Sequence, residues 1–119
     1  MAVSLEFREY LKDMLAVLGP IRMRAMFGGL GIYCGDLFFA LVIEDQLYFK
    51  ADVQTVSLFE EQGSRPFEYE RQGKTASLRY FTAPESVYED EDEMRYWGRL
   101  ALAAAQRSGG KTRKPARDV

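Results

Sequence analysis

Apolar residues recur with two different periods along the chain, and these periods divide it into expected helices and strands. Near the N-terminus the apolar positions are Phe7, Leu11, Met14, Leu15 and Leu18. Their spacing of three and four residues places them on one face of an α-helix. Ser4 is a suitable N-cap, and Gly19-Pro20 would end the helix because proline cannot continue it. We therefore predict one amphipathic helix at the start of the chain.

Short runs rich in β-branched and aromatic residues follow, at 21–27, 30–34, 37–43 and 47–50. Turn signals such as Gly28-Gly29 and Gly35-Asp36 separate them and leave no room for crossover helices, so the pairing should be antiparallel. The run 37–43 is apolar on both faces. This predicts a central strand that is covered by a helix on one side and by something else, such as a second subunit, on the other.

The second half of the chain repeats both patterns. Asp52 is predicted to cap a short helix that ends at Gly63. Alternating residues at 67–72 and 76–81 then predict a hairpin around a Gly73-Lys74 turn, and a last helix should run over 91–106. The order α-β-β-β-β-α-β-β-α predicts an α+β fold, in which an antiparallel sheet of about five to six strands packs against helices.

Composition and charge define one domain and a tail. The 119 residues are 47% hydrophobic, enough to form a core, and we expect a folded domain over 1–108. Residues 109–119 are predicted to form a flexible basic tail. Its four basic residues and one acidic residue leave 12 basic and 17 acidic residues in the rest, a net charge of −5. An acidic body would repel phosphate, so nucleic-acid binding would need the tail or a local patch.

Several chemistries lack the residues they need. The chain has no histidine and one cysteine, Cys34, which excludes a Cys–His pair, a Ser–His–Asp triad and an intramolecular disulfide. The acidic stretch 89–93 lacks the glycine-centred spacing of a calcium loop, and a solvated helix N-terminus explains it better. We expect no catalytic residues, no metal and no cofactor. The absence of a signal-peptide pattern and of a membrane-length apolar run indicates a cytoplasmic protein.

The glycine cluster has two interpretations. The N–H groups of Gly28 and Gly29 could cradle a phosphate, but phosphate-binding loops place their glycines between a strand and a helix. Here the glycines lead into another strand. The structural interpretation, a positive φ in a hairpin or a bulge, therefore fits better.

Basic residues interleave with aromatic residues in the expected strands. The basic candidates for a binding site are Arg22, Arg24, Lys50, Arg71, Lys74 and Arg79. If they converge beside Tyr48, Tyr69 and Tyr80, they form a face suited to an acidic protein partner or to single-stranded nucleic acid. The alternative is ordinary outward-facing alternation of charged residues.

An ordered series of motifs resembles the N-terminal domain of the TfoX/Sxy family of competence regulators. The segment 24–33, RAMFGGLGIY, resembles the family signature, and matching segments follow at 39–42, 47–50, 66–69 and 97–105. The resemblance covers roughly residues 8–106. It implies a two-layer α/β domain similar to type III secretion chaperones. It also implies a role beside regulators that assist a cAMP-receptor-type transcription activator, although those regulators carry a second, C-terminal domain.

The sequence thus favours a non-enzymatic regulatory domain that binds a protein partner, such as a transcription activator, with homodimerisation through the strand at 37–43. The alternative is direct nucleic-acid binding through the tail and the strand cations. A small-molecule-binding domain is a further alternative, which a deep pocket with convergent polar groups would support.

Overall fold

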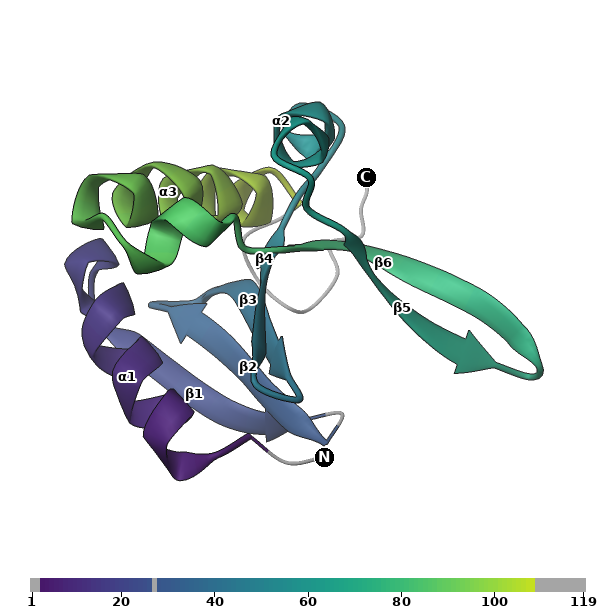
Figure 1. The fold of residues 1–119 in the computed structure, drawn as a ribbon, viewed down its shortest axis with the longest axis horizontal. Coiled ribbons are helices and arrows are strands. Elements are labelled where there is room, and N and C mark those ends of the chain that lie inside the picture. The colour runs from purple at the N-terminus through teal and green to yellow at the C-terminus, as the bar shows by residue number, and fades with distance from the viewer. Residues whose placement is uncertain (1–2, 27, 109–119) are drawn as a thin grey trace.

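The computed structural model describes residues 3–26 and 28–108, which form one layer of helices against one sheet (Figure 1). The elements, in chain order, are α1 (Leu5–Leu15), the 3-10 helix η1 (Ala16–Leu18), β1 (Ile21–Met26), β2 (Gly29–Cys34), β3 (Leu37–Ile43), β4 (Gln46–Lys50), α2 (Val56–Glu61), β5 (Pro66–Arg71), β6 (Lys74–Thr82), the 3-10 helix η2 (Glu85–Tyr88) and α3 (Glu91–Arg107). Residues 109–119, where the basic tail was predicted, lie outside the described residues.

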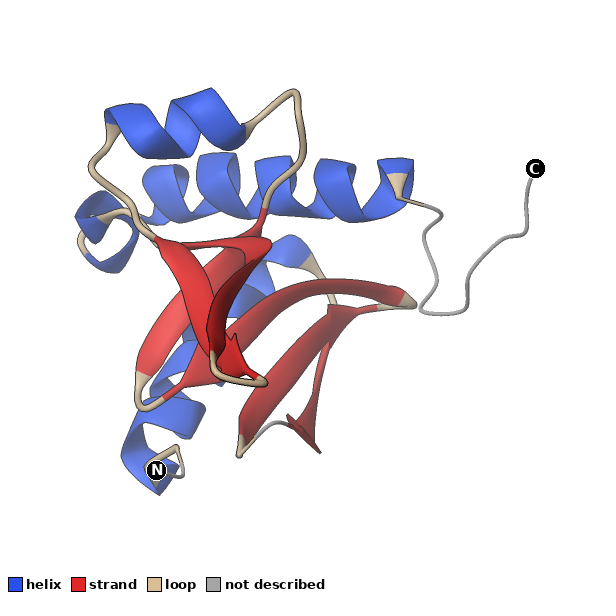
Figure 2. Ribbon diagram, turned by 90° about the vertical axis from the view of Figure 1, so that its right-hand side faces the viewer, coloured by secondary structure: helices blue, strands red, loops and turns tan. Residues whose placement is uncertain are grey.

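The six strands form a single antiparallel sheet in the order β1-β2-β3-β4-β6-β5. β1 and β5 are therefore its two edges, and the β5–β6 hairpin projects away from the rest of the molecule (Figure 1). The helices gather above and behind the sheet, and none of the described helices lies on its opposite side (Figure 2). The predicted α+β class and the order of elements are confirmed.

Local sequence signals position α1 as expected. The Ser4 hydroxyl accepts a hydrogen bond from the Phe7 N–H at 3.1 Å, which satisfies one of the free donors of the first turn. Leu11 and Leu15 are fully buried against the sheet. The α-helix stops at Leu15, and one 3-10 turn leads to Gly19, whose φ of 135° suits glycine.

The long helix α3 supplies most of the cover over the sheet. Asp90 caps it by accepting the Asp92 N–H at 2.8 Å, and acidic side chains fill its first turn, where the helix dipole favours them. Met94 and Trp97 are buried, and the Trp97 ring lies 4.9 Å from that of Phe59 in α2. This contact joins α2 to the core.

Some local features differ from the prediction. Asp52 does not cap α2, which begins at Val56; its carboxylate instead accepts bonds from the Gln54 N–H and from Arg107. Lys74 belongs to β6, because the hairpin turn is Gln72-Gly73, with φ values of 54° and 79°. The 3-10 helices η1 and η2 were not predicted, because a single turn leaves no periodic pattern.

The doubly apolar strand β3 is covered on both faces within the chain. A bulge opposite Ile32 and Tyr33 places the consecutive residues Phe39 and Ala40 both in the helix-side core. Leu41 alternates to the other face, yet only 1% of its surface is exposed. Burial of Leu41 therefore does not require a second subunit.

Candidate partner-binding site

The sheet face without a helix, here called the open face, carries the candidate site. Strand alternation and register assign to it Arg22, Arg24 and Met26 of β1, Tyr33 of β2, Phe38 and Leu41 of β3, Tyr48 and Lys50 of β4, Phe67 and Tyr69 of β5, and Tyr80 of β6. Of the six basic candidates, Arg22, Arg24 and Lys50 thus share a sheet face with the aromatic residues.

Aromatic rings pack side by side across the open face. The Tyr33 and Phe38 centroids are 5.0 Å apart, and Phe38 and Tyr80 are 5.9 Å apart. A second group joins Tyr48 to Phe67 at 5.3 Å. Burial raises the pKa of the Tyr80 hydroxyl well above its usual value. The rings thus form a packed second layer rather than an exposed apolar patch.

Two cations lie over this layer. The Arg22 guanidinium is 4.6 Å from the Tyr33 centroid, and the Lys50 ammonium is 5.0 Å from the Tyr80 centroid. Tyr33 and Tyr80 are each only 6% exposed. Burial also lowers the pKa of Lys50, against the opposing effect of Asp52. The cations therefore occupy the ring faces that a flat ligand would need.

Charge is segregated on this face. Among strand positions with described side chains, those that alternate onto the open face include four cations, Arg22, Arg24, Lys50 and Lys74, and no Asp or Glu. The chain as a whole has more acidic than basic residues. The open face is therefore a local basic surface on an acidic protein.

The basic residues Arg22 and Arg24 lie on an edge strand. β1 pairs with β2 alone, and within the described residues no backbone hydrogen bond joins Ile21–Met26 to any other segment. An edge strand turns half of its N–H and C=O groups outward, where another strand can pair with them. Both arginines are exposed, and no described residue forms an ion pair with Arg24.

A hollow of about 340 Å³ lies at the end of β1. It is lined by Val3, Arg8, Ala25, Met26, Gly28, Gly29 and Leu30, most of them apolar. Sequence reasoning missed Arg8, because helical periodicity marked it only as a solvent-facing residue of α1. Arg8 therefore lies near the end of β1, the strand that carries Arg22 and Arg24.

The glycines at this corner have structural reasons to be glycine. Gly28 has a φ of 76° in the turn between β1 and β2, and a Cβ on Gly29 would lie 2.0 Å from the Val42 carbonyl oxygen. This supports the hairpin interpretation over a phosphate cradle. Neither glycine opens a helix, unlike the glycines of a phosphate-binding loop.

The remaining candidates lie elsewhere. Arg71 pairs with Lys74 at the tip of the projecting hairpin, and the Arg71 side chain lies outside the described residues. Arg79 alternates to the helix side of the sheet, and it lines a pocket of about 360 Å³ with Lys50, Asp52 and Arg107. The six basic candidates thus do not form one cluster: Arg22 and Arg24 share β1, Lys50 and Arg79 line one pocket, and Arg71 and Lys74 are at the tip of the hairpin.

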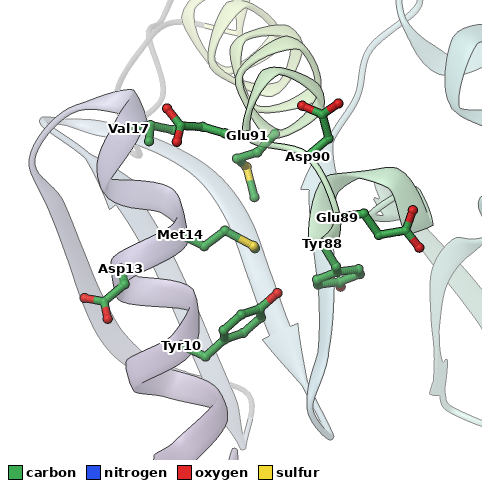
Figure 3. A pocket seen from close by; sticks show the side chains of 9 residues that line it. Tyr10, Asp13, Met14, Val17, Tyr88, Glu89, Asp90 and Glu91 are labelled. Carbon is green, nitrogen blue, oxygen red and sulfur yellow. The ribbon is translucent and has the colours of Figure 1, made fainter.

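The acidic stretch 89–93 lies where α3 begins. It borders a pocket of about 260 Å³ in which the Tyr10 and Tyr88 rings stack at 6.4 Å (Figure 3). The carboxylates of Asp13 and Glu89 point away from the space between the rings (Figure 3). No group of three or more potential metal ligands occurs among the described residues.

Cys34 has the properties of a structural thiol. Its Sγ donates to the Leu18 carbonyl at 3.6 Å, and burial raises the pKa of the thiol, which disfavours the reactive thiolate. In the described part of the chain, no helix is long and apolar enough to cross a membrane.

Comparisons with known proteins agree with the fold and the motifs. A family model described as the TfoX N-terminal domain matches residues 13–105. The chain is 27% identical over 120 residues to Protein Sxy of Escherichia coli K12, which covers 98% of this chain and 57% of Sxy. It is 34% identical over 68 residues to the DNA transformation protein TfoX1 of Aliivibrio fischeri, which covers 57% of this chain and 32% of that relative. The chain thus spans little more than half of Sxy and a third of TfoX1. Because the match includes all six strands and nearly all of α3, the chain belongs to the TfoX N-terminal domain family.

Proposed function

We propose that the protein is a non-enzymatic regulatory domain that acts in transcription control by binding a protein partner at the β1 end of the open face. The observation that carries this proposal is the pair of exposed arginines, Arg22 and Arg24, on an edge strand that pairs with β2 alone and on a face whose described strand positions hold no Asp or Glu. Edges and faces of this kind are sites of protein recognition rather than of catalysis.

The relatives support the regulatory part of the proposal. TfoX1 is named as a DNA transformation protein. The family resemblance of the sequence motifs implies a cAMP-receptor-type transcription activator as partner. Burial raises the pKa of the Cys34 thiol, which disfavours its nucleophilic thiolate form. We place the protein in the cytoplasm, where such an activator works.

Titration of the full chain with a purified cAMP-receptor-type activator, followed by light scattering and calorimetry, tests the proposal. We expect a complex whose affinity falls in the double variant Arg22→Gln/Arg24→Gln. The control variant Arg79→Gln, which removes an exposed cation on the other side of the sheet, should leave the affinity unchanged. A folded protein that forms no complex at tens of micromolar, or equal weakening by both variants, would contradict the proposal. The same light-scattering data report on the predicted homodimer.

Direct nucleic-acid binding is the second candidate, because the open-face cations could also contact phosphates. Binding to phosphates releases counterions and therefore weakens steeply with salt. A labelled duplex and a labelled single strand, titrated at low and moderate salt, separate this candidate from the first.

A further inference from the structure

We propose that the β1 edge binds an extended segment of the partner in which carboxylate and apolar side chains alternate, so that the segment adds a strand to the sheet. This inference rests on the proposed function and names the chemistry of the partner at the same site. It combines three observations: the unpaired edge, the arginines on one side of that edge, and the apolar surface on its other side.

The unpaired edge provides the backbone contacts. β1 is six residues long, and its outward N–H and C=O groups are free of backbone partners among the described residues. A strand of about the same length, roughly 20 Å, could pair along it. Main-chain bonds of this kind give affinity, and alternate side chains give specificity.

The side chains of β1 specify the alternation. On the open face an added strand would lie beside Arg22 and Arg24, which would attract carboxylates. On the helix side it would lie beside Ile21 and Met23, which pack against the core, and close to the apolar hollow at Ala25 and Leu30. Apolar side chains at alternate positions would extend that core.

The other edge has the opposite character. β5 begins with Pro66, which has no N–H to donate, and it exposes Glu68 and Glu70. These carboxylates would repel an acidic segment. The two edges therefore differ in charge, and only β1 suits an acidic strand.

A second copy of the chain fits β1 poorly. Pairing two β1 strands would bring the arginines of both copies together without carboxylates between them. A nucleic-acid strand also fits less well than a peptide. The rings of Tyr33 and Tyr80 are covered by Arg22 and Lys50, so they are not available for base stacking.

Fluorescence anisotropy with short labelled probes tests the inference on the full chain. The main probe is an eight-residue peptide of alternating Glu and Val; the controls are a peptide of the same composition with four Glu followed by four Val, a peptide with Lys in place of Glu, and a ten-nucleotide oligothymidylate. We expect the alternating acidic peptide to bind most tightly. Arg22→Gln/Arg24→Gln should weaken it by about tenfold or more, and Arg79→Gln by less than twofold.

Two further variants keep the result interpretable. Arg24→Gln alone removes no hydrogen bond, ion pair or ring contact among the described residues, so it should fold normally and still weaken peptide binding measurably. Replacing Lys111, Arg113, Lys114 and Arg117 by Gln should leave peptide binding within about twofold, since the proposed site does not include them.

The inference would be overturned if no peptide bound up to millimolar concentration, if the two acidic peptides bound equally, or if the variants of Arg22 and Arg24 bound as the wild type does. Tighter binding of the oligothymidylate would assign the face to nucleic acid. Self-association of Arg22→Gln/Arg24→Gln without peptide binding by the wild type would mean that the arginines only protect the edge. If the activator binds but the peptide does not, the proposed function stands and this inference fails.

Discussion

At the scale of single residues, the two adjacent glycines after β1 are required for different reasons. Gly28 has nothing within 4 Å of its absent Cβ, and its φ of 76° is the constraint. Gly29 has an ordinary φ, but its Cβ would meet the Val42 carbonyl oxygen at 2.0 Å and Ile43 Cδ1 at 2.9 Å. One glycine is required by its own backbone conformation and the other by its neighbour strand.

Alanine substitutions separate these two reasons. Gly28→Ala should lower the free energy of unfolding by about 1 kcal/mol, the cost of a left-handed conformation for a residue with a Cβ. Gly29→Ala should cost more, roughly 1–3 kcal/mol, because backbone atoms must move. Urea unfolding measures both, with Gly63→Ala, whose φ is 80°, as a second example of the conformational cost alone. Equal losses for Gly28→Ala and Gly29→Ala would contradict the close approach.

The sequence alone could predict why position 28 is glycine, but not why position 29 is. A Gly-Gly pair between two apolar runs predicts a turn, and the structural interpretation of Gly28 follows from that local signal. The contact of Gly29 with Val42 depends on how β2 and β3 pair, which no local pattern specifies. The same limit applies to Asp52, which was predicted as a helix cap and instead binds Arg107, 55 residues later in the chain.

At the scale of secondary-structure elements, that pair ties the loop after β4 to the last turn of α3. The Arg107 Nε donates to Asp52 Oδ2 at 2.6 Å and its Nη2 donates to Oδ1 at 3.0 Å. The hydrogen bond from Arg107 holds the pKa of the Asp52 carboxyl below its ordinary value near 3.8. The folded state therefore binds the proton of Asp52 less readily than the unfolded state does.

The lowered pKa of Asp52 predicts that the stability of the fold depends on pH. The stabilisation from Asp52 should be complete above about pH 4 and should be lost as the pH falls through its lowered folded-state pKa. Arg107→Gln should remove much of this dependence, so the urea midpoints of variant and wild type should converge in acid. If the difference between the urea midpoints of Arg107→Gln and wild type stayed constant from pH 6 down to pH 2, the pair would not stabilise the fold.

The open face makes a second prediction at this scale, because its ring layer buries Leu41. Leu41→Ala should lower the free energy of unfolding by about 2–5 kcal/mol, as in a helix-covered core. Leu5→Ala, at a position that is 72% exposed, should change it by less than about 0.5 kcal/mol. A small loss for Leu41→Ala, measured in urea, would mean that the rings cover Leu41 only loosely.

The strands and helices themselves were largely predictable, since each is long enough to show its period. The bulge in β3 was not, because Phe38, Phe39 and Ala40 are all apolar and alternation cannot reveal which of them is the extra residue. For the same reason the sequence showed that β3 needs cover on both faces but not that Tyr33, Phe38 and Tyr80 provide it.

At the scale of the whole molecule, the fold separates charge that the sequence intermixes. Arg79 and Tyr80 are neighbours in sequence, yet β6 turns them to opposite faces. Only the strand register shows that Arg22, Arg24 and Lys50 share a face whose described strand positions hold no Asp or Glu. The sequence could thus predict which cations belong to a candidate site. It could not predict that two of them lie on an edge strand or which face of the sheet they share.

Hydrogen exchange of the full chain, with and without the saturating activator, tests the central claim most directly. We expect the amides of β1 (Ile21–Met26) to gain protection while those of the opposite edge, β5 (Pro66–Arg71), stay unchanged as an internal reference. Protection confined to β5 or to the helices, or a complex without any change in β1, would contradict the assignment of the binding site to this edge.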